Sequence, residues 1–179
     1  MSNYKTFPGV QNGQTFEVAG IEFVKFPSVD GKTPVVAKEI LFDSVFGDSN
    51  NLTESKVLKK LEAEVLPQII AEVGEENVCT FKTDLTTLDG LKPYSELDSC
   101  ISLPTFDFYR ANVEIFDKHK VDDWWWLATP DSALPHYKPA WVVCVSPSGG
   151  IDDYGYCDGN SGVRPILIFE SSIFESSEE

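Results

Sequence analysis

The side chains best suited to bind a ligand gather in one polar stretch, residues 152–161. Its carboxylate and amide oxygens are of the kind that calcium prefers, and its tyrosines offer rigid aromatic surface of the kind found in antibody loops. Because the stretch is rich in glycine, we expect a binding loop between two strands. A solvated acidic loop is the alternative interpretation. The candidate ligand-binding residues are Asp152, Asp153, Tyr154, Tyr156, Asp158 and Asn160.

Other reactive side chains are sparse. The four cysteines have no CxxC spacing, so neither a zinc ribbon nor a thiol redox motif is predicted, and buried free thiols are expected. The chain has two histidines, His119 and His136. We therefore predict no catalytic residues, no metal site and no cofactor.

The charge excludes one large class of partner. The net charge is -15, from 29 acidic and 14 basic residues, and no cluster of Lys and Arg stands out. Proteins that grip phosphate backbones need such clusters, so direct nucleic-acid binding is not expected. No apolar run is long enough to insert into a membrane, and the first residues lack a signal-peptide apolar region.

Aromatic residues mark the expected structural centre. In the stretch WWWLATP, residues 124–130, an extended chain would point Trp124 and Trp126 to one face and Trp125 to the other. Indoles are costly to leave in water, so this segment is expected at the middle of a sheet. The matching element is GVRPILIF, residues 162–169, whose arginine needs a carboxylate or an indole beside it. The predicted structural centre comprises Trp124, Trp125, Trp126, Trp141 and Arg164.

The remaining pattern predicts an α+β chain of one domain, with a small antiparallel sheet, one long helix and one short helix. Alternating apolar residues predict strands at 15–18, 21–26, 34–40 and 141–145. Helical spacing predicts a long helix from residue 52 to 66, a kink at Pro67 and a second piece ending at Gly74. A short helix is expected after Pro104, with Phe106, Tyr109, Arg110 and Val113 along one side. Residues 1–13 are expected to form an N-terminal arm, 14–170 the domain, and 171–179 a loosely held acidic tail.

The order of these elements, with WWWLATP followed by GVRP, resembles an uncharacterised family of bacteriophages and Firmicutes that carries Trp-Trp-Leu-Arg-Ser-Pro-like and Gly-Val-Arg-Pro motifs. The resemblance spans about residues 14–170 and departs from the pattern at Ala128-Thr129, where the family often has Arg-Ser. It implies a C-type-lectin-like fold, shared with formylglycine-generating enzymes and with phage receptor-binding domains diversified by retroelements.

The resemblance also frames the expected function. The chain lacks the close cysteine pair of the copper enzymes, the histidine cluster of the iron enzymes, and the Glu-Pro-Asn, Gln-Pro-Asp and Trp-Asn-Asp triplets of calcium-using lectins. The expectation is a non-enzymatic virion surface, tail, head-decoration or receptor-binding protein that presents residues 152–161. Its partners would be a protein or glycan receptor or other virion proteins, and a homo-oligomer is compatible with this role.

A second hypothesis comes from the acidity alone. It is an acidic inhibitor in the host cytoplasm that binds a basic defence protein such as a nuclease, with affinity that depends on dispersed Asp and Glu side chains.

Overall fold

Two tight hairpins build the first sheet. In the computed structural model, which describes residues 3–134 and 140–176, strands β1 (Thr15–Val18), β2 (Ile21–Lys25) and β3 (Lys32–Ala37) run antiparallel in sequence order. Two-residue turns join them at Ala19-Gly20 and, next to β3, at Asp30-Gly31, and all four turn residues have positive φ. Such mirror-image turns match the twist of paired strands. The predicted hairpin and third strand are confirmed.

Ala19 is an unfavourable residue for its turn. Its φ is 52°, in the left-handed region that costs an alanine about 1 kcal/mol and costs glycine almost nothing. We expect Ala19→Gly to raise the free energy of unfolding by roughly 0.5–1 kcal/mol, measured by denaturant titration. The matched control is Ala71→Gly on the exposed side of the long helix, where the same substitution should lower stability by about 1 kcal/mol. Equal effects at the two sites would contradict the assignment of strain to Ala19.

A long helix follows, and it passes through the proline without ending. A 3₁₀ turn, η1 (Leu52–Glu54), leads to Ser55, whose Oγ accepts a hydrogen bond from Leu58 N and so caps the helix. The helix consists of α1 (Lys56–Lys60), the π-helical segment η2 (Leu61–Val65) and α2 (Leu66–Val73). In the π-helical turn Leu66 N–H bonds back to Leu61 O. This wider turn lies just before Pro67, which cannot donate a backbone hydrogen bond. Gly74 ends the helix at φ 90°, as predicted.

The C-terminal third joins two sheets rather than closing one. The predicted continuous element 162–169 divides at Arg164-Pro165 into β10 (Asn160–Val163) and β11 (Ile166–Glu170). β11 completes the first sheet in the order β1-β2-β3-β11, whereas β10 lies in a five-stranded sheet with the order β4-β10-β7-β8-β9. The pair β10 and β7 is parallel and the other named pairs are antiparallel. The other strands of this sheet are β4 (Phe42–Val45), β7 (Trp125–Pro130), β8 (Trp141–Val145) and β9 (Ile151–Tyr156).

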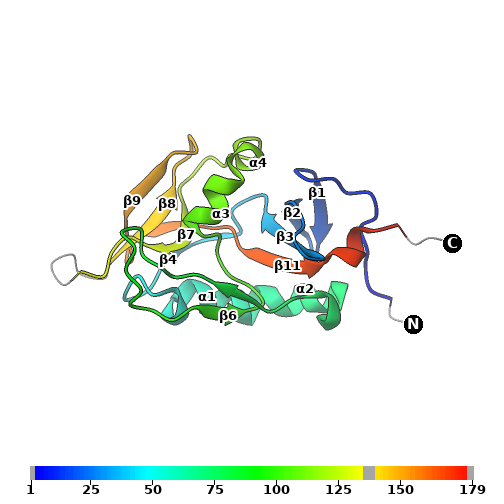
Figure 1. The fold of residues 1–179 in the computed structure, drawn as a ribbon, viewed down its shortest axis with the longest axis horizontal. Coiled ribbons are helices and arrows are strands. Elements are labelled where there is room, and N and C mark those ends of the chain that lie inside the picture. The colour runs from blue at the N-terminus through cyan, green and yellow to red at the C-terminus, as the bar shows by residue number, and fades with distance from the viewer. Residues whose placement is uncertain (1–2, 135–139, 177–179) are drawn as a thin grey trace.

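The mixed α+β class is therefore confirmed, but the prediction of one small antiparallel sheet is wrong. Besides the four-stranded and five-stranded sheets, β5 (Phe81–Thr83) and β6 (Leu97–Ser99) form a two-stranded sheet. Periodicity identifies strands singly and does not show which of them pair, so the number and size of sheets were underestimated. Figure 1 shows the long helix running along one side of both larger sheets, with α1 near β4 and α2 near β1.

Strand β7 separates two apolar clusters. Trp126 and Ala128 lie in the larger cluster with the long helix, while Trp125 and Leu127 lie in a second cluster with Tyr109 and Phe116. The predicted alternation along WWWLATP is thus confirmed. Trp124 is an exception, because it precedes the strand and is 38% exposed.

Short helices cover the second cluster. α3 (Phe106–Ala111) and α4 (Val113–Asp117) replace the single short helix that was expected. Tyr109 is buried, whereas Arg110 and Val113 are exposed. Two 3₁₀ turns, η3 (Glu75–Asn77) and η4 (Ser171–Phe174), complete the described elements. Ile173 and Phe174 are buried, and Phe7 N–H donates a hydrogen bond to Ile173 O. The prediction of a loosely held tail was therefore wrong for residues 171–174. No helix in the described ranges combines the length and apolarity needed to cross a bilayer.

Candidate functional site

The N-terminal end of α3 is fixed to the end of strand β7. Thr105 caps the helix, with its Oγ1 accepting a hydrogen bond from Phe108 N at 3.1 Å. Thr129 Oγ1 accepts another from Phe106 N at 2.9 Å, and Ala128 N donates to Pro104 O at 2.8 Å. Because the first amides of a helix have no partner within it, these two hydroxyls hold α3 in place.

A second segment, residues 84–91, faces this helix end. Asp84 follows β5 and its Oδ1 accepts hydrogen bonds from Thr86 N at 2.9 Å and Thr86 Oγ1 at 2.6 Å. Leu88 N donates to Pro130 O at 2.9 Å, and Leu91 N donates to Thr87 Oγ1 at 2.8 Å. The bond from Leu88 attaches the segment to the same end of β7 that holds α3, and the other bonds close turns within the segment.

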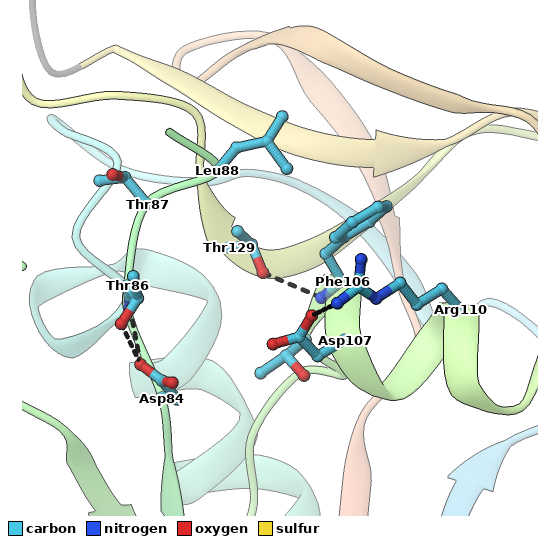
Figure 2. Close-up of a pocket in the computed structure, with 9 residues that line it drawn as sticks. Asp84, Thr86, Thr87, Leu88, Phe106, Asp107, Arg110 and Thr129 are labelled. Atoms are coloured by element: carbon cyan, nitrogen blue, oxygen red, sulfur yellow. Dashed lines mark hydrogen bonds and ion pairs between the residues drawn. The ribbon is translucent and has the colours of Figure 1, made fainter. Parts of the chain in front are cut away.

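A cavity of about 230 Å³ lies between the two segments, and we call it the threonine pocket. Figure 2 shows Asp84 and Thr86 on one side of it and Phe106 and Asp107 on the other, with Thr129 between them. Arg110 Nη2 lies 2.9 Å from Asp107 Oδ1, and its guanidinium lies 5.3 Å from the centroid of the Phe106 ring. The lining residues are Asp84, Thr86, Thr87, Leu88, Thr105, Phe106, Asp107, Arg110 and Thr129.

The threonine pocket is lined by one ionised carboxylate and one ion pair. Hydrogen bonds from the side chain and then the backbone of Thr86 lower the pKa of Asp84, so this carboxylate is ionised at neutral pH and accepts hydrogen bonds. A general acid needs the opposite shift. Across the cavity the charge of Asp107 is balanced by Arg110. The pocket thus offers oxygen acceptors, a planar donor and two apolar side chains, Leu88 and Phe106.

All nine lining residues fall within one matched region. Residues 83–171 match the model of a domain of unknown function, DUF6273. No curated protein and no solved structure matches the chain. The matched region is incomplete as a packed unit, since its strands β10 and β11 pair with β4 and β3, which precede it.

The predicted binding loop at residues 152–161 is instead mostly strand. Residues up to Tyr156 form β9 at the edge of the five-stranded sheet, and Asn160 begins β10. Asp152 pairs with Cys144 and Asn160 with Val45, so these two residues belong to different strand pairs. The loop prediction failed because polar and glycine-rich residues also suit an exposed edge strand and its turn.

The exposed candidates of this region do not reach the threonine pocket. Tyr156 is 46% exposed opposite Trp141, and Asp158 is exposed in the turn before β10. The side chains of Asp153 and Tyr154 lie outside the described part of the structure. In the described residues, no three His, Cys, Asp or Glu side chains are grouped closely enough to hold a metal ion.

Arg164 occupies the junction between the two large sheets. It is 1% exposed, its Nε donates to Ala37 O at 3.0 Å and its Nη2 to His119 O at 3.3 Å. The guanidinium lies 4.5 Å from the centroid of the Trp125 ring, which is the stacking on an indole expected from the sequence. Burial lowers the pKa of Arg164 to about 10, so it remains charged at neutral pH. Trp125 and Trp126 are both buried and Trp141 is half-buried. Of the five residues in the predicted structural centre, Trp124 is the one that is exposed.

Proposed function

We propose that the protein is a non-enzymatic binding protein of C-type-lectin-like fold, and that the threonine pocket is its ligand site. The observation that carries the proposal is the location of all nine pocket residues within the DUF6273 match. The fold assignment is supported by the central position of the WWWLATP strand and by the pairing of the last strand, β11, with β3 near the other end of the chain. The lowered pKa of Asp84 supports its role as an ionised acceptor of hydrogen bonds from a ligand.

The ligand we propose is an uncharged, polyhydroxylated group such as one saccharide ring. Asp84 and the threonine oxygens accept hydrogen bonds from hydroxyls, Arg110 donates to them, and Phe106 and Leu88 cover apolar C–H faces. A cavity of about 230 Å³ is smaller than the roughly 300–1,000 Å³ of pockets for drug-sized ligands, so it suits a single ring. A glycan receptor of a phage-type virion surface protein would present such a ring.

Glycan-array binding tests this proposal with paired variants. We expect the protein to bind at least one class of glycan on the array. The substitution Arg110→Gln should weaken that binding at least tenfold. Its melting temperature should change little, because Arg110 and Asp107 are exposed and such ion pairs contribute about 0–1 kcal/mol. Lys118→Gln, which removes the same charge from an exposed position after α4, is the control and should bind normally.

Absence of binding to every glycan, or equal losses in the two variants, would overturn the saccharide assignment. The second candidate function is an acidic inhibitor of a basic protein, for which the specific observation is the net charge of -15. That function predicts binding that weakens steeply with salt and does not depend on the threonine pocket.

A further inference from the structure

Lys25 is a mostly buried cation at the end of β2, and it is not among the residues of the threonine pocket. The residue is 9% exposed, its Nζ donates to Asn12 Oδ1 at 2.7 Å, and the ammonium lies 5.4 Å from the centroid of the Phe174 ring. Within the described residues, no Asp or Glu carboxylate lies within 4.0 Å of Lys25 Nζ. A buried charge without a counter-ion is unfavourable, and burial lowers the pKa of Lys25.

A cavity of about 450 Å³, widely open to solvent, is lined in part by this lysine, and we call it the Lys25 pocket. It lies between the N-terminal arm, the hairpin that contains Gly31 and the last 3₁₀ turn, η4. Val10 and Phe174 provide apolar wall, and Ser28 and Ser171 provide hydroxyls. The volume falls within the roughly 300–1,000 Å³ of typical ligand pockets.

The hydroxyls leave one hydrogen available to a ligand. Ser28 Oγ lies 2.7 Å from Thr33 Oγ1, which lies 2.8 Å from Ser171 Oγ, so three hydroxyls share two hydrogen bonds. Thr33 is fully buried, whereas both serines line the Lys25 pocket. When Thr33 donates to one serine, that serine keeps its own hydrogen free to point into the cavity.

We propose that the Lys25 pocket binds the carboxylate of a small organic acid. Lys25 is the counter-ion of the carboxylate, a serine hydroxyl is its second donor, and the apolar part of the acid packs against Phe174. One buried positive charge matches one negative charge, and the acidity of the whole chain disfavours a dianion such as phosphate. Glu175 also lines the cavity, but it is exposed, so water and salt screen its repulsion of the ligand more than they screen the attraction of the less exposed Lys25.

Butyrate and inorganic phosphate are the probes, added at constant ionic strength to the full chain and followed by the amide NMR signals of Gly31 and Ser171. We expect butyrate to give saturable shifts with one site, and phosphate to bind more weakly. Lys25→Met should weaken butyrate binding at least tenfold, because the counter-ion is lost while the volume is retained. The control Lys59→Met removes an exposed charge from α1 and should leave binding unchanged within twofold.

A second measurement uses the unaltered protein and so does not depend on how the variant folds. Bound carboxylate favours the ammonium form, so saturating butyrate should raise the pKa of Lys25 read from its side-chain carbon signals. The proposal is overturned by shifts that do not saturate, by equal losses in the Lys25 and Lys59 variants, by tighter binding of phosphate, or by an unchanged lysine pKa. It is independent of the function proposed for the threonine pocket.

Discussion

Trp126→Ala should lower the free energy of unfolding by about 3–5 kcal/mol, the range for emptying a buried aromatic site. Trp126 is 1% exposed, packs edge-on against Phe46 at 5.5 Å between ring centroids, and donates from Nε1 to Ser44 O at 2.9 Å. Its ring also lies against Gly155, where an added Cβ would stand 2.7 Å from Trp126 Cζ3. The variant therefore loses contacts to β4 and β9 together.

Trp124→Ala is the matched control for this prediction. The neighbouring indole is 38% exposed and precedes the strand, so its removal should cost less than about 1 kcal/mol. Denaturant titration of both variants gives the comparison. A similar loss of stability in the two variants would show that the core does not depend on the face of β7 that carries Trp126.

Arg164→Ala is expected to have the other large effect, a loss of about 3–5 kcal/mol. The substitution leaves the carbonyls of Ala37 and His119 without their donor and uncovers the Trp125 ring. Arg164→Met should lose less than Arg164→Ala, because it refills the space without restoring the hydrogen bonds. Arg164→Lys should not recover the wild-type value, since an ammonium lacks the planar fork that reaches two carbonyls.

Arg110→Ala separates the effect of burial from that of losing an arginine. Arg110 lies on the surface in an ion pair within α3, so its loss should cost about 0–1 kcal/mol. Thermal unfolding of the three Arg164 variants and of Arg110→Ala gives the order of their stabilities. If Arg164→Ala were no more destabilising than Arg110→Ala, the junction between the sheets would not depend on the guanidinium.

The elements that were predicted well are those whose signal is local. The alternation at Trp125 and Trp126 and the helix end at Gly74 follow from side-chain period and glycine conformation. The break at Arg164-Pro165 was missed because the apolar run appears continuous in the sequence. The pairing of β10 with β4 and of β11 with β3 shows that this run contributes one strand to each of two sheets.

The threonine pocket was missed for a related reason. Its residues come from three segments around Asp84, Phe106 and Thr129, and no spacing along the chain brings these together. The available local signals were Asp84 two residues before Thr86, typical of an Asx turn, and Thr105 ahead of a helix, typical of a cap. They predict turns and helix ends, and the pocket arises only because β7 holds both.

The position of β10 also governs how this chain can fold during synthesis. Among the strands of the described residues, β4 pairs with β10 alone, yet more than a hundred residues separate the two in the order of translation. Until residues 160–163 leave the ribosome, β4 and one edge of β7 have no strand beside them, although the β1-β2-β3 meander can already pair. Unpaired edges of this kind favour aggregation. A stalled nascent chain that ends before residue 160 should therefore be captured by chaperones, and one that extends through residue 170 with room to leave the exit tunnel should be released.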